Sequence, residues 1–194
     1  VDPHQGAYQH GTGADSHLVL ASEFIGNGKM RGRSTISVST DISKAFEVVP
    51  VLELKRAVAG MSGVTTAMKR LMCSFIEERS YQVRVTAGDS HYYSRRKAQV
   101  NGLAQGSCLG PAIWNAFYNG VIVEMRKLDR QFTGGANSGI KSNETLNLCF
   151  ADDLVLLQQY KASSSLERDR AERHLQKKIE TFQAWLTQRG MIAA

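Results

Sequence analysis

Two adjacent carboxylates lie between two apolar runs in the segment LNLCFADDLVLL, residues 146–157. The apolar runs predict two short strands, Leu146–Ala151 and Leu154–Gln158, and therefore place Asp152 and Asp153 at the tip of a hairpin. A two-residue tip favours Asn-Gly or Asp-Gly, which accept positive φ, and two like charges repel each other at close range. An Asp-Asp tip is therefore an unfavourable turn that needs a stabilising partner.

A third carboxylate follows another predicted strand. The segment STISVSTD, residues 34–41, alternates apolar and polar residues and places Asp41 on the polar face at the strand end. Taken alone, Asp41 is explained as a helix N-cap, and Asp152 and Asp153 can be explained as solvated turn acids. Together the three carboxylates form a cage suited to hard divalent cations such as Mg²⁺ or Mn²⁺, which prefer oxygen ligands. A bound cation would offset the repulsion between Asp152 and Asp153.

A Gly-rich loop provides a second candidate site. The segment NGLAQGSCLGP, residues 101–111, has glycines at 102, 106 and 110 around Gln105. Glycines let a backbone approach a ligand closely, and the Gln105 amide can both donate and accept a hydrogen bond. The alternative is a loop that only caps the helix predicted over 111–127, with Pro111 in its first turn. The loop has neither the Walker lysine nor the dinucleotide fingerprint, so the sequence does not favour those phosphate sites.

Helices alternate with strands along the rest of the chain. Apolar spacing predicts further helices over 14–27, 46–60 (with Pro50 near its N-terminus) and 63–79, a hairpin that turns at Gly88, and a loop over 133–143. A last helix has an apolar stripe made of Ala171, Leu175, Ile179, Phe182 and Leu186. Its charged run ERDRAERHLQKK is interpreted as the solvated face, so His174 receives no catalytic role.

Composition narrows the class of partner. The 194 residues are 42% hydrophobic, enough to bury a core, and the net charge of +6 favours an anionic partner such as nucleic acid. Three isolated cysteines indicate neither a zinc knuckle nor a disulfide framework and fit a reducing compartment. No apolar run approaches the roughly 18 residues of a membrane span, so no membrane partner is expected. The chain begins without Met, and we expect a fragment of something longer.

Basic residues cluster in two places. Lys29, Arg31 and Arg33 precede the strand that ends at Asp41, and a second cluster, which consists of Arg95, Arg96 and Lys97, precedes the Gly-rich loop. Either cluster can contact phosphates and add salt-dependent affinity. The alternative for both is an ordinary solvated surface.

The order of these segments resembles a known family. DISKAFE, GLAQGSCLGP and CFADD resemble motifs A, B and C of reverse transcriptases, those of non-long-terminal-repeat retrotransposons and group II introns in particular. The resemblance implies an α/β (α+β) polymerase palm, with an antiparallel sheet flanked by helices and part of the fingers, and with the thumb missing. Residues 1–33 would be the end of the fingers, and residues 34–194 the palm, with inserted fingers helices and a hairpin at about 46–100 and an end at the start of motif D.

The resemblance also implies roles for single residues. Asp41, Asp152 and Asp153 would hold two Mg²⁺ ions for nucleotidyl transfer. The deoxynucleoside triphosphate would contact Ile42, Lys44, Ala45, Phe46, Gln105 and Gly106, with Phe46 as the steric gate that rejects a ribose 2′-hydroxyl. The RNA template and DNA primer would contact Arg95, Arg96 and Lys97. An intracellular protein is implied, nuclear if the retrotransposon is eukaryotic and otherwise cytoplasmic.

Departures from the family pattern leave alternatives open. Ala104 stands where the family usually has Pro, Glu47 where Asp is commoner, and the chain stops before the expected motif D lysine. We therefore expect this chain alone not to extend primers. One alternative is an RNA-dependent RNA polymerase-like palm enzyme, which Phe46 argues against. Another is a decayed, catalytically incompetent reverse-transcriptase module that acts only in nucleic-acid binding.

Overall fold

The structure, a computed structural model, describes residue 2 and residues 4–133 and 140–193. The chain divides into two compact units, one made of residues 1–43 and 118–194 and the other of residues 44–117. Part of the loop predicted over 133–143 lies outside the described residues.

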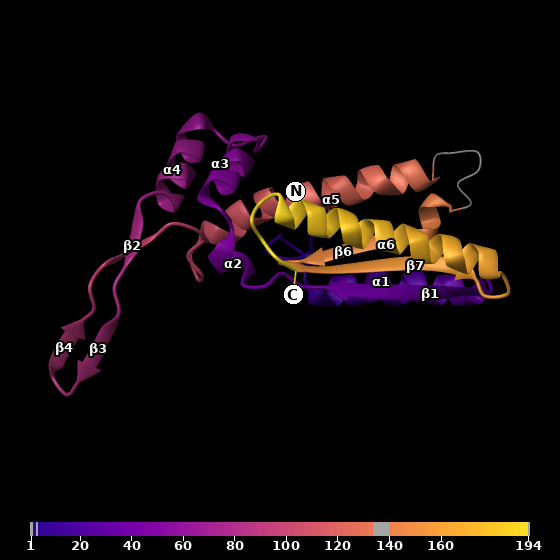
Figure 1. Cartoon of the computed structure of the whole chain (residues 1–194), viewed down its shortest axis with the longest axis horizontal. Coiled ribbons are helices and arrows are strands. Elements are labelled where there is room, and N and C mark those ends of the chain that lie inside the picture. The colour runs from indigo at the N-terminus through magenta and orange to yellow at the C-terminus, as the bar shows by residue number, and fades with distance from the viewer. Residues whose placement is uncertain (1, 3, 134–139, 194) are drawn as a thin grey trace. The chain divides into compact units, whose positions relative to one another are not determined.

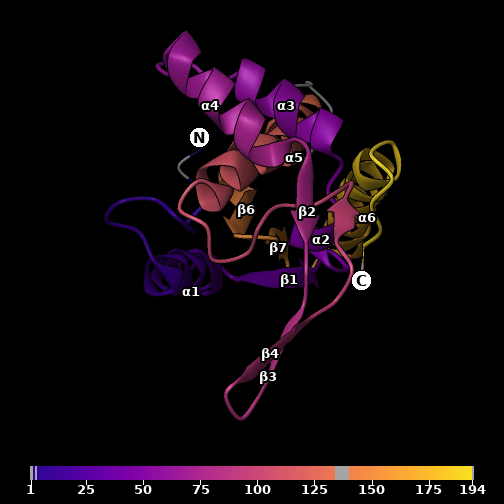
Figure 2. The same ribbon diagram turned by 90° about the vertical axis from the view of Figure 1, so that its left-hand side faces the viewer.

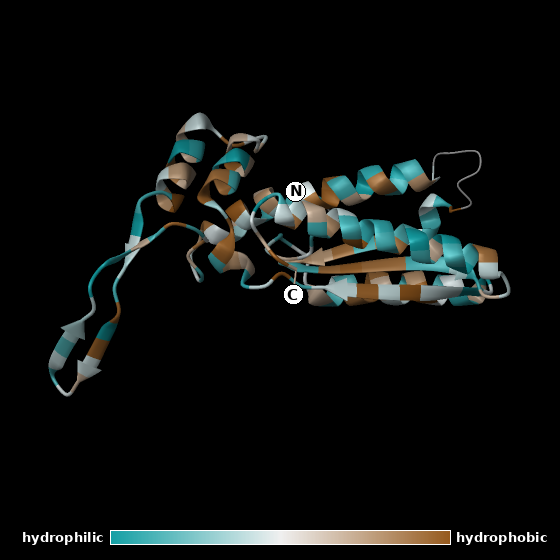
Figure 3. Ribbon diagram, viewed as in Figure 1, coloured by the Kyte–Doolittle hydropathy of each residue, from teal (hydrophilic) through white to brown (hydrophobic). Residues whose placement is uncertain are grey.

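The first unit contains a three-stranded antiparallel sheet and long helices (Figure 1). Its elements are α1 (Ala14–Met30), β1 (Arg33–Thr40), the C-terminal part of α5 (Gly110–Thr133), a short 3-10 helix η1 (Ser142–Glu144), β6 (Thr145–Phe150), β7 (Asp153–Lys161) and α6 (Ser165–Thr187). The strand order is β1-β7-β6, so β7 is central. A central strand that is covered on both faces is apolar on both, which explains the apolar run 154–157 and the hydrophobic colour of β7 in Figure 3.

Helices cover both faces of this sheet. Successive side chains of a strand point to opposite faces, and two neighbouring glutamines of β7 report what lies on each face. Gln158 Oε1 lies 2.8 Å from Nδ1 of His174 in α6, whereas Gln159 Nε2 donates to the carbonyl of Phe24 in α1 at 2.6 Å. Therefore α6 covers one face of the sheet and α1 the other.

Helix α5 packs beside α6 through aromatic side chains. A Cβ at Gly120 would lie 3.3 Å from the Trp185 ring, so the missing side chain lets the indole approach the α5 backbone. Tyr118 meets the same indole edge-on, with 6.4 Å between ring centroids. Tyr118 and Leu186 are fully buried, and Trp185 is nearly so. These contacts place the core of the first unit between α5, α6 and β7.

Helix α6 corrects one prediction. It begins as its sequence indicates, with Ser164 as N-cap accepting a hydrogen bond from the backbone N–H of Glu167. However, His174 and Lys178, both within the run interpreted as solvated, are fully buried. Lys178 is tolerated there because its Nζ lies 2.6 Å from Oδ1 of Asp129 in α5.

The second unit contains shorter helices and a protruding pair of strands (Figures 1 and 2). Its elements are α2 (Ala45–Val48), α3 (Val51–Ala59), α4 (Thr66–Ile76), β2 (Arg79–Tyr81), β3 (Arg84–Ala87), β4 (Ser90–Tyr93), β5 (Lys97–Gln99) and the start of α5. Strand β2 pairs with β5, and β3 pairs with β4 around the predicted turn at Gly88. The strands β3 and β4 extend away from α3 and α4 in both views.

The helix predicted over 46–60 is two helices. Helix α2 ends at Val48, Val49 is extended with ψ 125°, and Pro50 is the N-cap of α3. The residue before a proline is disfavoured in the helical region, so the chain breaks at Val49. The helices predicted over 14–27, 63–79 and 111–127 are present as α1, α4 and α5 with shifted ends. No helix among the described residues has the length and apolar character needed to cross a bilayer.

Candidate active site

The pairing of β1 with β7 brings the predicted carboxylates to one end of the sheet. Thr40 pairs with Leu154, so Asp41 follows β1 at the edge where the turn between β6 and β7 lies. Asp152 belongs to this turn and Asp153 begins β7. The sheet thus assembles three carboxylates from two segments that are about 110 residues apart in the sequence, a separation that antiparallel pairing removes.

The predicted register of the hairpin was wrong by one residue. Phe150 pairs with Asp153, so the two-residue tip is Ala151–Asp152 and not Asp152–Asp153. Ala151 takes the positive φ, 56°, that the tip requires. A non-glycine residue in this region is strained by about 1–2 kcal/mol, so the tip needs support from its surroundings.

Gln5 gives that support and was missed by the sequence analysis. Its Oε1 accepts from the Ala151 N–H and its Nε2 donates to the Ala151 carbonyl, each at 3.1 Å. The Gln5 side chain is fully buried, and its neighbours run beside β6, since Cys149 N donates to His4 O at 2.9 Å and Gly6 N to Cys149 O at 2.8 Å. No local pattern in the sequence connects residue 5 with residue 151.

Tyr118 of α5 holds the next residue of the tip. Its hydroxyl donates to the backbone carbonyl of Asp152 at 3.0 Å. Burial above all, and then the nearby Cys149 and Asp152, raise the pKa of the Tyr118 phenol well above its ordinary value. The phenol therefore remains protonated and can donate this hydrogen bond at neutral pH.

The carboxylates interact electrostatically. Burial raises the pKa of Asp152, and the charges of Asp41 and Asp153 raise it further, while the Asp152 backbone N–H opposes the shift. Asp41 and Asp153 are exposed, and Asp41 Oδ1 accepts from the N–H of Ile42 at 2.7 Å. Among the residues that the structure describes, no three His, Cys, Asp or Glu side chains lie close enough together to hold a metal ion. The donors are nevertheless all oxygens, the kind that a hard divalent cation prefers.

The residues expected to contact a nucleotide fall in both units. Ile42, in the first unit, is buried and forms an isolated antiparallel bridge with Ala193. In the second unit, Lys44 is exposed, has a left-handed φ of 52° and precedes α2, in which Ala45 is buried. Phe46 is half-buried and its ring stacks on Trp114, with 4.6 Å between centroids and 24° between planes. Phe46 is therefore both a packing residue, through its contact with Trp114, and exposed enough to remain a candidate for the steric gate.

The Gly-rich loop uses its glycines differently from the prediction. Gly102 (φ 86°) admits the chain's own backbone, because a Cβ there would lie 2.5 Å from the Glu47 carbonyl oxygen. Leu103 N donates to Phe46 O at 2.6 Å and Gly102 N to Val49 O at 2.7 Å, so the loop is hydrogen-bonded to α2 and the residue after it. Gln105 and Gly106, by contrast, are exposed at a turn, and Gly106 has open space around it. This turn is therefore accessible to a ligand from solvent.

The two basic clusters differ in their surroundings. Arg33 forms ion pairs with Glu144 at 3.0 Å and Glu167 at 3.1 Å, so it links β1 to η1 and α6. Lys29 and Arg31 of the same cluster are exposed. The second cluster, made of Arg95, Arg96 and Lys97, is exposed throughout. It is this second cluster that is available to a partner.

Comparisons with known proteins identify the family of the chain. Residues 3–194 match the family model described as "Reverse transcriptase (RNA-dependent DNA polymerase)". The chain is 25% identical over 158 residues to a "Retrovirus-related Pol polyprotein from type-1 retrotransposable element R2" of Popillia japonica, covering 81% of this chain and 21% of the relative. A second polyprotein of that description and species is 25% identical over 146 residues, covering 75% of this chain and 22% of the relative. The chain thus spans about a fifth of the length of these curated relatives.

Solved structures show the same fold at low identity. Apo telomerase from Candida tropicalis matches with a TM-score of 0.57 and 13% identity, covering 93% of this chain and 30% of that one. Telomerase from Candida albicans in complex with a TWJ fragment of telomeric RNA matches with a TM-score of 0.53 and 12% identity, with the same coverage. The expected fold class, a mixed helix and sheet polymerase palm, is confirmed.

Proposed function

The chain belongs to the reverse transcriptase (RNA-dependent DNA polymerase) family, and from this premise we propose that it is the catalytic palm of a retroelement polymerase. In this proposal the protein adds deoxynucleotides to the 3′-hydroxyl of a DNA primer that is paired with an RNA template. The names of its R2 relatives support a retrotransposon origin. The RNA fragment in the Candida albicans telomerase complex supports an RNA partner.

One observation carries the proposal, namely that Asp41, Asp152 and Asp153 lie at the same end of the sheet. Asp152 interacts with both other carboxylates strongly enough to contribute to its raised pKa. Without a function, a fold gains nothing from gathering like charges on a strained turn, because strain of this kind collects at functional sites. The carboxylates are held on strands and a braced turn, which is the rigid support that a catalytic site requires.

The three carboxylates fit a pair of Mg²⁺ ions by their chemistry. When bound, the ions would lower the pKa of the primer hydroxyl and neutralise the triphosphate and the leaving pyrophosphate. Asp41 and Asp153 have exposed side chains that can change rotamer, so binding would draw them toward Asp152. Relief of the repulsion between the carboxylates would contribute to the affinity for the ions.

The residues expected to contact the nucleotide have separate roles in the proposal. The backbone at Lys44 and Ala45 would bind the triphosphate, and the exposed turn at Gln105 and Gly106 would contact the incoming base. Phe46 would exclude the ribose 2′-hydroxyl, since its ring is held in place by Trp114. Ile42 is buried beside the carboxylates and would fix the backbone at Asp41.

Primer extension with matched variants tests the proposal. This chain and a longer one that spans the length of its R2 relatives would each be given an RNA template, a DNA primer, deoxynucleotides and Mg²⁺. We expect extension by the longer chain only, and its loss by at least about 100-fold in Asp152→Asn, because the site acts chiefly by electrostatic stabilisation. Asp169→Asn, an exposed acid on α6, is the control and should leave extension unchanged.

Other outcomes lead to the alternatives. Extension with ribonucleotides in preference to deoxynucleotides would indicate an RNA polymerase-like enzyme. Binding of the template by the longer chain without any extension would favour a module that only binds nucleic acid.

A further inference from the structure

The four paired strands of the second unit have no core of their own. The segment 79–99, named the ribbon here, contains β2, β3, β4 and β5 (Figures 1 and 2). Every residue from Ser80 to Ala98 is exposed. An isolated two-stranded hairpin is marginally stable in water, because it buries little apolar surface. An ordered segment with this exposure is typical of a surface that binds a partner.

The charge of the ribbon selects the kind of partner. It contains one carboxylate, Asp89, and five cations, which are Arg79, Arg84, Arg95, Arg96 and Lys97. In the described part of the chain, none of these cations forms an ion pair with a carboxylate. Basic side chains that are exposed and unpaired attract negative charge. They therefore favour a polyanion over a protein surface that has no cluster of acidic residues.

Aromatic side chains lie on both faces of the ribbon, and Arg84 accompanies one of them. Directly opposed residues of an antiparallel pair share a face, so Arg84 lies beside Tyr93 on one face, and Val85 lies beside Tyr92 on the other. Tyr92 is 62% exposed and Tyr93 58%. Exposed rings can stack on unpaired bases while neighbouring guanidinium groups bind phosphates, which is how proteins hold single strands.

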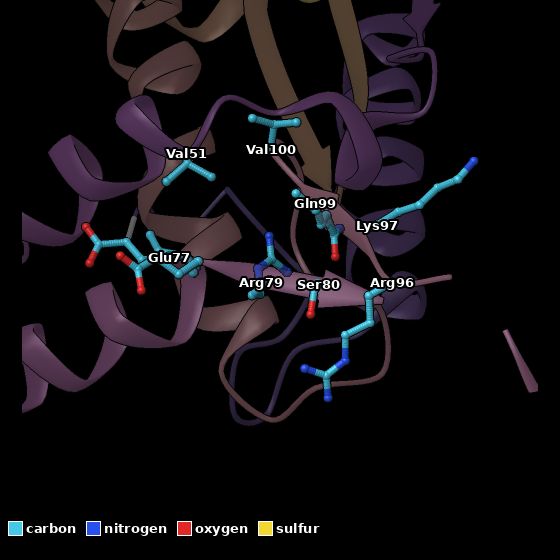
Figure 4. A pocket seen from close by; sticks show the side chains of 11 residues that line it. Val51, Glu77, Arg79, Ser80, Arg96, Lys97, Gln99 and Val100 are labelled. Atoms are coloured by element: carbon cyan, nitrogen blue, oxygen red, sulfur yellow. The ribbon is translucent and has the colours of Figure 1, made fainter. Parts of the chain in front are cut away.

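The base of the ribbon is also basic. A cavity of about 550 Å³ lies there, lined by Val51, Ile76, Glu77, Glu78, Arg79, Ser80, Arg96, Lys97, Ala98, Gln99 and Val100. Figure 4 shows Arg79 within this group and Arg96 and Lys97 extending away from it toward solvent. Arg79 donates to the Gly102 carbonyl, while its buried Nε and Nη1 have no acceptor among the described residues. The lining therefore contains three cations, Arg79, Arg96 and Lys97, and two carboxylates, Glu77 and Glu78, of which Glu77 pairs with Lys55.

The residue before Arg79 has a strained backbone. Glu78 connects α4 to β2 with a φ of 47°, a left-handed conformation for a residue other than glycine. Such strain persists where the surrounding structure requires it, and it is concentrated at binding and catalytic sites.

We propose that the ribbon is a binding arm for single-stranded nucleic acid. Arg84, Arg95, Arg96 and Lys97 contact the phosphates, and Tyr92 and Tyr93 stack on bases. The identity of the bound strand rests on the proposed function. If the protein is a reverse transcriptase palm, the strand is the part of the RNA template that has not yet been copied. The binding itself requires neither the carboxylates nor a metal ion.

Fluorescence anisotropy with a labelled 12-nucleotide RNA of mixed sequence, in EDTA and at several salt concentrations, tests the arm. A variant with Gln at 84, 95, 96 and 97 should bind at least tenfold more weakly, and its log–log salt slope should be smaller by about 3, since about 0.7 is lost per phosphate contact in single strands. The control carries Gln at Lys161, Arg168, Arg173 and Lys177, which are exposed cations elsewhere. It removes the same charge and should weaken binding less than threefold.

A second variant separates stacking from charge. Tyr92→Ala with Tyr93→Ala leaves the charge unchanged and should weaken binding by at least about fivefold, because stacking on one ring contributes roughly 1–3 kcal/mol per base. Equal losses in the ribbon and control variants, or unchanged affinity in the tyrosine variant, would overturn the proposal. Since all these residues are exposed, circular dichroism should show that every variant keeps its fold.

The measurement also distinguishes this proposal from the proposed function. Asp152→Asn should bind the RNA as the unchanged chain does. Loss of RNA binding in the ribbon variants, together with absent primer extension by the unchanged longer chain, would support the arm and contradict the polymerase. RNA binding that is unchanged in the ribbon variants, with primer extension intact, would contradict the arm and support the polymerase.

Discussion

The side-chain amide of Gln5 forms hydrogen bonds with both backbone groups of Ala151, although the two residues are 146 positions apart in the chain. Ala151 has a left-handed φ of 56° and directly precedes Asp152. Gln5 thus satisfies the two polar groups of a strained peptide at the point where the chain presents a candidate metal ligand. This contact couples the N-terminal segment to the geometry of the carboxylates.

Gln5→Met should destabilise the protein by about 2–3 kcal/mol, because it retains the length of the side chain but removes both hydrogen bonds between Gln5 and Ala151. Ala151→Gly should recover part of this loss in the Gln5→Met background, since glycine adopts a positive φ without strain. Urea unfolding of the single and double variants measures the coupling. Gln183→Met, an exposed site on α6, is the control and should change the free energy of unfolding little. Strict additivity of the two changes would contradict the coupling.

Asp152→Asn should stabilise the protein at neutral pH in the absence of divalent cations. Burial and the neighbouring carboxylates raise the pKa of Asp152 in the folded protein above its unfolded value. Between those two values the folded protein binds more protons than the unfolded chain, so stability falls as pH rises through that window. Thermal melts from pH 3 to 8 in EDTA should show this fall in the unchanged protein and a weaker one in Asp152→Asn.

Divalent cations should reverse that ranking. Mg²⁺ or Mn²⁺ should raise the melting temperature of the unchanged protein by binding the folded state, and should raise that of Asp152→Asn much less. Isothermal titration with Mn²⁺ gives an independent measurement. Equal Mn²⁺ binding by the unchanged protein and Asp152→Asn would contradict a metal site at the three carboxylates. The control, Asp169→Asn, should bind Mn²⁺ like the unchanged protein.

The carboxylate end of the sheet was predictable because local patterns determine it. Strict alternation places Asp41 on the open face of β1, and the apolar run that follows Asp153 indicates a buried strand. The position of the turn was not predictable to one residue, because its positive φ falls on Ala151. That choice depends on Gln5, a residue that no local pattern connects to the turn.

The buried polar cluster under α6 was hidden for a different reason. Lys178 continues the stripe of Ala171, Leu175 and Phe182 at 3- and 4-residue spacings, so periodicity alone places it inside. Its charge suggested the opposite, because lysine is almost never fully buried unless it is paired. The pairing partner, Asp129, lies on another helix, and only the tertiary structure reveals it.

Lys178→Met should cost about 3–5 kcal/mol of stability, because it removes the cation from a buried pair and leaves Asp129 unbalanced. Lys178 Nζ also donates to Thr145 Oγ1 at 2.6 Å and Asn147 Oδ1 at 2.8 Å, and both bonds would be lost. Burial alone would raise the pKa of Asp129, but hydrogen bonds from His174 and Lys178 and the Lys178 charge lower it overall. The variant should therefore raise this pKa, which NMR titration of the carboxyl can measure.

Lys177→Met is the matched control for that variant. Lys177 is exposed one position earlier on α6, and its Nζ pairs with the Glu180 carboxylate at 3.3 Å. Its replacement should change stability by less than about 0.5 kcal/mol. Similar losses in the two variants would mean that helix propensity, and not the buried pair, dominates at this position.

Phe46→Val should raise ribonucleotide incorporation relative to deoxynucleotide in a chain long enough to extend primers. Removing the ring opens space for a 2′-hydroxyl, so the effect should appear in the ratio of kcat/KM values for the two substrates. Phe46→Tyr keeps a ring that can stack on Trp114 and should keep the ratio. An unchanged ratio in Phe46→Val would leave Phe46 with a packing role alone.

Gly102→Ala and Gly106→Ala test whether the Gly-rich loop is shaped by the chain or by a ligand. Both glycines have positive φ, 86° and 76°, so each substitution should introduce about 1 kcal/mol of backbone strain. At Gly102 the new Cβ would also lie 2.5 Å from the Glu47 carbonyl oxygen, whereas at Gly106 it would meet nothing within 4 Å. Gly102→Ala should therefore lose at least about 2 kcal/mol more than Gly106→Ala in urea unfolding, because the loop must separate from α2. In a chain that extends primers, Gly106→Ala should instead raise KM for the nucleotide with little change in stability. Equal stability losses at the two positions would mean that the hydrogen bonds from Gly102 and Leu103 to α2 contribute nothing to holding the loop.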